Sequence, residues 1–390
     1  MVGEPMDQLA NTHVTGIDEQ HLTPLVRKAL QQDSTEIVSW HYEVLQGGLG
    51  DLGVGLVGVY RFYGQARIGD LLAPWSIVLK SNRVPVGTEN AAYLRREWQA
   101  YHASFLAALN GPVVAPACLA TSQQPDNLYW IWQEHLVDVY PQPWTLTHYA
   151  TVAQHFGQWN GSYLTGEPLP DYSWFCRSTA REWAEQAAPE VEFLRTVLDH
   201  PLVQQVYPHG QAMAIVQLWD ERERFFQALE SLPQTICHND AFRRNLFGRR
   251  QPDGSEQTVA IDWTYLGWGA LGEEVAAMVV GNLGFGEVDW AIAVEFTSQI
   301  FDHYLTGLRT SGWAGDPKTV RLGFTAAAAM KYCFPYTLRA MFSEEGQAWL
   351  TQLREQQNFT PLDNAFQKRS FIFTLADEAR QLIAEQAQRT

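Results

Sequence analysis

The chain has 390 residues, 46% hydrophobic and 18% charged, so it can bury a large core and is not an intrinsically disordered chain. The formal net charge of -16 argues against nucleic acid as the main partner, because phosphate binding requires a basic face. Four cysteines lie far apart with no CxxC pair, which predicts reduced thiols and argues against a disulfide framework or a zinc site.

The amino-terminal third is predicted to be mostly β-structure. Leucine and valine spacing behind an acidic start predicts a helix at 18–33, and a second helix is expected at 88–110. β-Branched and aromatic residues predict strands at 36–46, 59–64, 75–80 and 128–136. The first two strands are joined by the glycine-rich stretch GGLGDLGVGLVG.

The remainder is predicted to be mainly helical. Apolar periodicity indicates helices at 145–164, 178–199, 211–231, 271–283, 288–308, 319–342 and 366–387. Between them, NLFGRRQPDGSEQTVAIDW predicts a short hairpin, because PDG marks a turn between two strands. We therefore predict an α+β chain with a β-rich amino-terminal lobe at 1–134 and a mainly helical carboxy-terminal lobe at 135–390.

No part of the sequence predicts secretion or membrane insertion. The first residues, MVGEPMDQLANTHVTG, have no basic flank followed by an apolar run. The most apolar segments, such as FTAAAAMKYCF, are too short to span a bilayer. A cytoplasmic protein is expected.

The stretch ICHNDAFRRNLF places charged and amide residues between apolar ends. Within it, His238, Asp240 and Asn245 form a His-x-Asp-x-x-x-x-Asn pattern, which a turn that binds its own backbone would also explain. Asp262 strengthens the catalytic interpretation, since an acid between apolar neighbours at a strand end is costly unless a cation meets it. Phosphoryl transfer needs such a set: one carboxylate orients the attacking hydroxyl, and an amide and a second carboxylate hold magnesium.

These motifs, HNDAFRRN and IDW, resemble the aminoglycoside phosphotransferase and choline kinase family, small-molecule kinases with a protein-kinase-like fold. The resemblance covers roughly residues 40–345 by the order of the motifs. It implies a bilobal fold in which Asp240 is the catalytic base and His238 braces the catalytic loop. It also implies that Asn245 and Asp262 bind Mg²⁺.

The resemblance requires two further residues upstream of these motifs. It implies a lysine that ends the third strand and binds the α- and β-phosphates of ATP, paired with a glutamate on the following helix. Lys80 closes WSIVLK, and Glu97 lies in the middle of the predicted helix. Glu89 is a less favoured partner, because an acid is expected in the first turn of a helix anyway.

Two other segments are expected to contact the nucleotide, which is ATP or, alternatively, GTP. GVGLVG has GxGxxG spacing, but a dinucleotide-binding loop needs a helix directly after it, and a strand is predicted. A glycine-rich hairpin over the phosphates fits better, with Gly48 and Gly50 as candidates among the seven glycines between 47 and 64. The hinge, which includes Glu134 and Leu136, is expected to bind adenine through backbone groups.

The sequence departs from the family pattern at two places. Phe242 stands two residues after Asp240, where many members have Lys or His. One of the two arginines that follow, with Arg244 as the candidate, could supply positive charge to the γ-phosphate, or both could pair with acids. Glu273-Glu274 replaces an aspartate at the next helix start, which we interpret as structural.

Only nine residues, TYLGWGALG, separate Trp263 from Glu273, too few for the activation segment of a protein kinase. We expect ATP-dependent phosphoryl transfer to a hydroxyl of a small molecule: an aminoglycoside, an amino alcohol, a sugar or another natural product. A kinase for a peptide or protein hydroxyl and a catalytically silent nucleotide-binding module are the alternatives. No nucleic-acid or membrane partner is expected, and the oligomeric state stays open. Five tryptophans either line the acceptor pocket or pack in the core: Trp174, Trp183, Trp219, Trp268 and Trp290.

Overall fold

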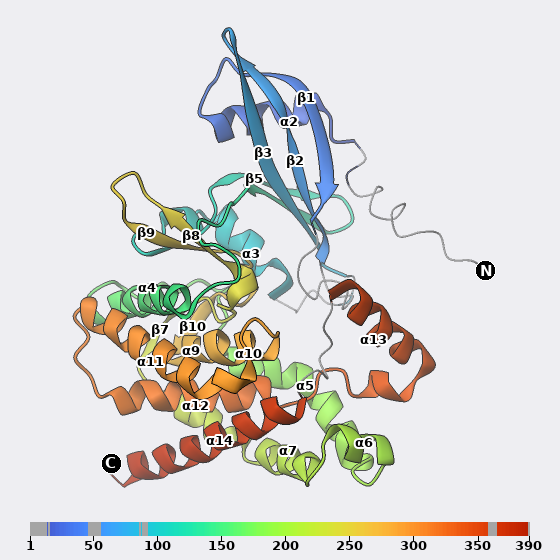
Figure 1. The fold of residues 1–390 in the computed structure, drawn as a ribbon, viewed down its shortest axis with the longest axis vertical. Helices are drawn as coiled ribbons and strands as arrows, with labels where there is room; N and C mark the ends of the chain where they lie inside the picture. Colours follow the sequence, from blue (N-terminus) through green and yellow to red (C-terminus); the bar gives the residue numbers. More distant parts are fainter. Residues whose placement is uncertain are drawn as a thin grey trace. The chain divides into compact units, whose positions relative to one another are not determined.

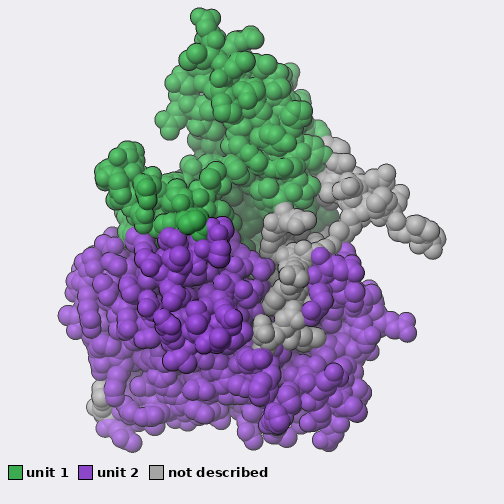
Figure 2. Space-filling view, in the orientation of Figure 1, with its two compact units in different colours: residues 1–141, 246–264 green, residues 142–245, 265–390 purple. Residues whose placement is uncertain are grey.

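The structure is a computed structural model that describes residues 14, 16–45, 56–85, 87, 93–357 and 365–388. The chain forms two compact units, coloured green and purple in Figure 2. The first comprises Met1–Pro141 and Leu246–Thr264, and the second comprises Gln142–Asn245 and Tyr265–Thr390. The hairpin around residues 246–264 therefore groups with the amino-terminal unit by its contacts, although helices flank it in the sequence.

The first unit is built on a five-stranded antiparallel sheet in the order β1-β2-β3-β6-β5 (Figure 1). Its strands are β1 (Glu36–Val44), β2 (Leu56–Ile68), β3 (Leu71–Arg83), β5 (Cys118–Gln124) and β6 (Leu128–Glu134). The turn between β2 and β3 places Gly69 at φ +59°, a conformation that glycine adopts without strain. Helix α2 (Glu19–Leu30) begins at the Asp18 cap and adds three buried side chains to the core of this sheet: Leu22, Leu25 and Val26.

A smaller three-stranded sheet completes the first unit. Strand β4 (Val113–Val114) pairs in parallel with β9 (Glu256–Ala260), which pairs with β8 (Leu246–Arg250) as the hairpin predicted from PDG. Helix α3 (Tyr93–His102) and the 3₁₀ turn η2 (Leu106–Ala108) precede β4. The fully buried Arg96 of α3 donates to the Thr264 carbonyl at 2.7 Å, which fixes the helix to the end of the hairpin segment.

The second unit is mainly helical. A two-stranded ribbon of β7 (Gln234–Cys237) and β10 (Gly267–Ala270) lies among its helices. The longer helices are α4 (Leu146–Thr165), α5 (Thr179–Thr196), α7 (Gln211–Asp220), α8 (Arg222–Ser231), α11 (Ala293–Thr310), α12 (Pro317–Tyr332), α13 (Glu344–Gln357) and α14 (Ala365–Ala387). The shorter pieces are α6 (Pro201–Val206), η3 (Arg243–Asn245), η4 (Trp263–Tyr265), α9 (Glu273–Ala276), a π-helical turn η5 (Ala277–Gly281), α10 (Asn282–Gly284), η6 (Trp290–Ile292) and η7 (Arg339–Phe342).

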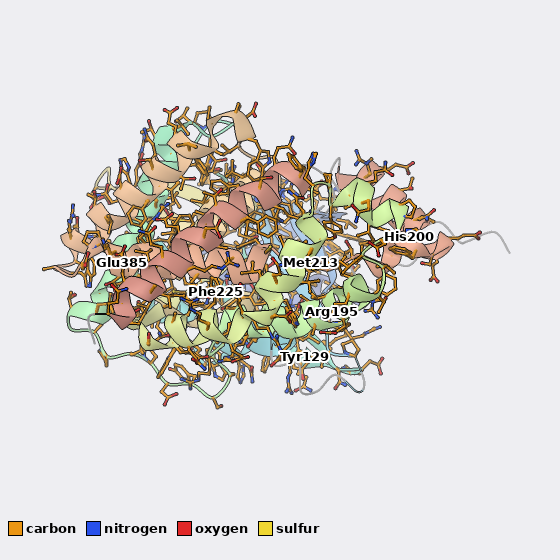
Figure 3. The ribbon with its side chains drawn as sticks, turned by 90° about the horizontal axis from the view of Figure 1, so that it is seen from below. Tyr129, Arg195, His200, Met213, Phe225 and Glu385 are labelled. Atoms are coloured by element: carbon orange, nitrogen blue, oxygen red, sulfur yellow. The ribbon has the colours of Figure 1, made fainter. Side chains whose placement is uncertain are left out.

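Helices α4 and α11 pack closely because glycine occurs where they meet. A β-carbon on Gly157 would lie 2.1 Å from the Tyr304 carbonyl oxygen, and one on Gly307 would lie 2.0 Å from that of Gln154. Helix α14 is held to the junction of α7 and α8, where Arg380 binds Glu221 at 2.8 Å. Figure 3 labels Phe225 of α8 beside α14 and Glu385 near the carboxyl end of α14.

Several elements differ from the sequence prediction. Strand β3 runs on to Arg83, so Lys80 lies inside the strand and not at its end. The helix predicted at 211–231 breaks at Glu221, and the one at 271–283 passes through a π turn. Strands β5, β7 and β10 and helix α13 were not predicted, because short or partly polar segments carry a weak periodicity signal. No helix of the described ranges combines the length and the apolar character that a membrane span requires.

Candidate active site

Three charged side chains from distant parts of the sequence meet in the first unit. The Lys80 ammonium of β3 lies 2.5 Å from Glu97 Oε2 of α3 and 3.0 Å from Asp262 Oδ1, two residues after β9. Lys80 and Glu97 are 12% and 3% exposed, whereas Asp262 is 39% exposed. Burial pulls the pKa of Lys80 down, but the carboxylates of Asp262 and Glu97 raise it overall. The lysine is therefore held as a cation.

The segment around Asp262 is held by α3 as well as by the lysine. The Trp263 backbone N–H donates to Glu97 Oε1 at 3.3 Å, so this carboxylate binds both Lys80 and the residue after Asp262. The fully buried Trp263 ring donates its Nε1–H to the Ala260 carbonyl at 2.8 Å. Asp262 has φ +61°, a left-handed conformation that aspartate tolerates better than most residues, and its Oδ1 accepts from the Thr264 hydroxyl at 2.7 Å.

The catalytic-loop motif lies in the second unit, between β7 and η3. His238 is fully buried, and its Nδ1 accepts the backbone N–H of Asp240 at 3.2 Å. The Asn245 amide nitrogen donates to the carbonyl oxygen and to Oδ2 of Asp240, both at 3.0 Å. The half-buried Asp240 is thus held from both ends of the motif: His238 binds its backbone N–H, and Asn245 binds its backbone carbonyl and one carboxylate oxygen. The structure brings His238, Asp240 and Asn245 together as the spacing predicts.

Buried charges from outside the motif hold the same loop. Glu274, the second residue of α9, accepts the backbone N–H groups of His238 at 2.7 Å and Asn239 at 2.9 Å. Lys331 of α12 donates its ammonium to the Asn239 carbonyl at 2.8 Å. Asn239, directly before Asp240, has φ +68°, a left-handed backbone conformation that is costly for most residues. The contacts with Glu274 and Lys331 stabilise this conformation. Burial raises the pKa of Glu274 to about 7, although the two N–H groups and Lys331 act in the opposite direction.

The residues after Asp240 pack against the α10 region. The Phe242 ring stacks on Phe285 with centroids 4.7 Å apart. The Arg244 guanidinium pairs with Glu287 at 2.7 Å and lies 5.1 Å from the centroid of the Phe285 ring. The Arg243 guanidinium lies 4.1 Å from the centroid of the Trp144 ring. Both arginines therefore have partners within the second unit, and the role of Arg244 at a γ-phosphate stays a prediction.

Only some of the residues predicted to contact the nucleotide lie within the described part of the chain. Gly48 and Gly50 lie outside the described residues, as does Glu89. The strand predicted after GVGLVG is present as β2. Glu134 ends β6, and its side chain accepts from the Ala117 N–H at 2.7 Å and pairs with Arg249 at 2.5 Å. Leu136 follows in non-repetitive backbone, so adenine binding by this hinge stays a prediction.

The donor sets of the two proposed metal ligands suit a hard cation such as Mg²⁺. Asn245 uses its amide nitrogen towards Asp240, which leaves the amide oxygen as its ligand atom. Asp262 keeps its carboxylate 39% exposed while Lys80 binds one of its oxygens. Within the described part of the chain, no group of three or more His, Cys, Asp or Glu side chains is placed to hold a metal ion.

Sequence reasoning missed two residues that hold the catalytic loop. Glu274 was interpreted as a helix-start acid, but its carboxylate is fully buried against the loop backbone. Lys331 lies in the apolar run FTAAAAMKYCF, and this apolar setting was the available signal in the sequence. In the structure its side chain is completely buried. A lysine inside such a run requires a buried partner, which here is the Asn239 carbonyl.

Residues 78–314 match the model of the phosphotransferase enzyme family. No curated protein matches the chain. Similar solved structures include amicoumacin kinase hAmiN in complex with AMP-PNP, Ca²⁺ and Ami, with a TM-score of 0.51, 14% identity, and coverage of 82% of this chain and 89% of that one. Ethanolamine kinase from Plasmodium vivax has a TM-score of 0.51, 10% identity, and coverage of 95% and 94%.

The GDP complex of a variant of aminoglycoside 2'-phosphotransferase-IIIa has a TM-score of 0.50, 12% identity, and coverage of 91% and 99%. At these identities the likeness is one of fold. It confirms the predicted α+β architecture, with a β-rich amino-terminal region and a mainly helical carboxy-terminal region.

Proposed function

Because the chain belongs to the phosphotransferase enzyme family, we propose that it transfers the γ-phosphoryl group of ATP to a hydroxyl group of a small molecule. GTP is the alternative donor. The observation that carries the proposal is the pairing of Lys80 with both Glu97 and Asp262. The buried Lys80 ammonium is held by the enclosed Glu97 carboxylate and the accessible Asp262 carboxylate. Such an ammonium is suited to binding phosphate oxygens, and Asp262 beside it is a candidate metal ligand.

Lys80 binds the donor phosphates in this proposal, and Glu97 positions it. The Glu97 carboxylate is nearly inaccessible to solvent, and its two oxygens bind the Lys80 ammonium and the Trp263 N–H. It therefore keeps the ammonium in place and is shielded from cations in the solvent. Asp262 and Asn245 are each an oxygen ligand of Mg²⁺, which neutralises phosphate charge when it is bound with the nucleotide.

Asp240 orients the acceptor hydroxyl and takes its proton at a carboxylate oxygen. Asn245 orients the carboxylate by donating to its Oδ2, and it also donates to the backbone carbonyl of Asp240. His238 fixes the backbone of Asp240 by accepting its N–H. Positioning is the main contribution expected of such a loop, since phosphoryl transfer requires little covalent chemistry from the protein.

A small-molecule acceptor is supported by two observations. Only nine residues separate Trp263 from Glu273, which leaves no room for the activation segment of a protein kinase. The structures of similar fold include a kinase named for amicoumacin, which is in complex with AMP-PNP, and an ethanolamine kinase; that of the aminoglycoside phosphotransferase is in complex with GDP.

Nucleotide-dependent stabilisation tests the proposal. ATP with Mg²⁺, at about 100 times its dissociation constant, should stabilise the wild type by roughly 2.7 kcal/mol in thermal unfolding. Asp262→Asn should lose most of this stabilisation, because asparagine tolerates the left-handed backbone but removes the charge. Asp253→Asn, which removes an exposed charge from the turn of the same hairpin, is the matched control and should respond as the wild type does.

The second arm separates catalysis from binding. Asp240→Asn should keep the nucleotide-dependent stabilisation and abolish ADP release in an acceptor screen that the wild type responds to. The proposal is refuted if neither ATP nor GTP stabilises the wild type, or if Asp262→Asn is stabilised equally well. Retention of transfer by Asp240→Asn would refute the role of Asp240 as the base.

A further inference from the structure

A cluster of aromatic and lysine side chains lies beside the catalytic loop, within the second unit. We call it the aromatic–lysine cluster. The Trp183 ring lies 5.3 Å from the Tyr265 and Tyr332 rings and 5.9 Å from the Tyr336 ring, measured between centroids. Helices α5, α12 and α14 and the segments after Trp263 and after α12 contribute its members: Trp183, Tyr265, Lys331, Tyr332, Tyr336 and Lys368.

Two hydrogen bonds connect this cluster to the residue before Asp240. Lys331 donates to the Asn239 carbonyl at 2.8 Å, and the Asn239 amide donates to the Tyr265 carbonyl at 3.0 Å. Burial, and after it the negative charge of Asp240, raises the pKa of the Tyr332 hydroxyl, so this hydroxyl lies within the field of that carboxylate. The cluster therefore borders the position that an acceptor hydroxyl must reach.

The aromatic rings of the cluster are already in contact with the chain's own ammonium groups. The Lys331 ammonium lies 5.2 Å from the centroid of Trp183 and 5.8 Å from that of Tyr332. The Lys368 ammonium lies 5.8 Å from the Tyr332 centroid. Aromatic faces attract cationic ligands, but here the ammonium groups of Lys331 and Lys368 already lie at the rings and would repel a second cation. The charges of Asp240, Glu273 and Glu274, which raise the pKa of the Tyr332 hydroxyl, act in the opposite direction.

Lys331 and Lys368 differ in the acids that surround them. The attraction of Lys331 opposes the rise that burial causes in the pKa values of Glu273 and Glu274, so these two acids lie within the field of Lys331. Burial, together with the Arg369 charge, lowers the pKa of Lys368 to about 8, and among the described residues no carboxylate offsets them. Lys368 therefore lacks a carboxylate partner within the part of the chain that is described.

Two hydrogen-bond donors of the cluster are buried without a partner among the described residues. They are the Tyr332 hydroxyl, on a side chain that is 8% exposed, and the Trp183 indole N–H. A buried donor that binds nothing is destabilising, so such groups bind a protein group, an ordered water, an ion or a ligand. Both donors belong to adjacent rings, and Lys368 lies beside one of them.

We propose that the aromatic–lysine cluster binds the acceptor, and that the acceptor is a ring-bearing hydroxyl compound with a neutral or anionic hydrogen-bond-accepting group. Polycationic aminoglycosides and quaternary amines are disfavoured as substrates. The rings provide an apolar surface, the Tyr332 and Trp183 donors and the Lys368 ammonium bind acceptor oxygens, and Asp240 receives the hydroxyl. This inference rests on the proposed phosphotransferase function and specifies its substrate class.

Three matched probes test the proposed charge preference. Each has a benzylic hydroxyl on the same ring and differs in the group at the para position, which is a carboxylate in para-hydroxymethylbenzoate, a second hydroxymethyl group in para-xylylene glycol and an aminomethyl group in para-hydroxymethylbenzylamine. Their dissociation constants are measured by ligand-observed NMR on the full chain with Mg²⁺ and AMP-PNP. The benzoate and the glycol should bind, and the benzylamine should bind at least about tenfold more weakly than the benzoate, because like charges repel.

Variants assign the preference to particular side chains. Lys368→Met should weaken the benzoate by about fivefold or more and leave the neutral glycol unchanged, since only the charged contact is lost. Tyr332→Phe should weaken both the benzoate and the glycol, because it removes a donor and keeps the ring. Lys318→Met is the control: it removes a lysine from an exposed pair with Glu385 at the other end of α12 and should change none of the three constants.

The results distinguish this inference from the function on which it rests. Three results would overturn the proposed substrate class. The benzylamine could bind as tightly as the benzoate, Lys368→Met could bind the benzoate as tightly as the wild type does, or none of the probes could bind. Stabilisation of the same protein by AMP-PNP and Mg²⁺ would show in each of these cases that the nucleotide site is intact. Absence of stabilisation of the wild type both by AMP-PNP and by GTP, each with Mg²⁺, would refute the phosphotransferase proposal itself.

Discussion

Removal of Lys80 should destabilise the protein through the acid that it leaves behind. In Lys80→Met, the Glu97 carboxylate is 3% exposed and, among the described residues, keeps only the Trp263 N–H as a partner. Breaking a buried ion pair on one side costs about 3–5 kcal/mol, because the remaining charge is desolvated and uncompensated. Asp262 adds little to this cost, since its carboxylate is 39% exposed and is screened by solvent.

A double-mutant cycle measures this effect. Urea unfolding at pH 7, followed by tryptophan fluorescence, compares the wild type, Lys80→Met, Glu97→Gln and the double variant. Lys80→Met should lose about 3–5 kcal/mol of unfolding free energy, and the double variant should be more stable than Lys80→Met, because no buried charge remains. Simple additivity of the two single changes, or a loss below about 1 kcal/mol in Lys80→Met, would refute the reasoning.

The sign of the pH dependence provides an independent check. Burial raises the pKa of Glu97 above its ordinary value, and the attraction of Lys80 opposes that rise. Without Lys80, the pKa of Glu97 in the folded protein should rise further. A carboxyl group whose pKa is higher in the folded than in the unfolded protein contributes stability at acid pH. This contribution is lost as the pH rises through the pKa of the folded state. Lys80→Met should therefore be less destabilised, relative to the wild type, at pH 5 than at pH 7.

Three further predictions concern the second unit. The pKa of Glu274, raised to about 7 from its ordinary value near 4.5, makes a contribution to stability that is lost as the pH rises through about 7. Glu274→Gln should thus flatten the fall in unfolding free energy between pH 5 and pH 8, and a slope equal to that of the wild type would count against the assignment. Asn160→Leu should cost about 2–5 kcal/mol in urea unfolding, because it leaves the Ile236 carbonyl and the Tyr304 hydroxyl unsatisfied. Tyr304→Phe, which breaks one of these bonds, should cost less than Asn160→Leu, and equal losses would contradict this account. Gly157→Ala should lower the unfolding free energy by about 1–3 kcal/mol by forcing α4 away from α11, and an unchanged melting temperature would refute the close contact.

The sequence by itself determined the residue types of the catalytic loop and their order along the chain. His238, Asp240 and Asn245 are close in the chain, so the spacing of a short loop sufficed to predict that their side chains meet. The family, the α+β class and most helices followed from local patterns for the same reason, since periodicity is a property of neighbouring residues. The hairpin around PDG was predictable because its turn chemistry lies within four residues.

The tertiary structure decided which distant residues meet. Asp262 is 182 positions from Lys80, and no local pattern indicates that β3, α3 and the end of β9 bring their charges together. The parallel pairing of β4 with β9, which groups the hairpin with the amino-terminal unit, is likewise a long-range contact. Such pairing depends on chain topology, which short-range periodicity does not encode.

The same reason explains why Glu274 and Lys331 were not recognised from the sequence. Each residue type fits its local context: an acid at a helix start and a lysine late in a helix. Only the folded chain buries both against the backbone of His238 and Asn239, directly before Asp240. Burial and partner choice arise from the packing of α9 and α12 against the loop, and these are properties of the three-dimensional arrangement alone.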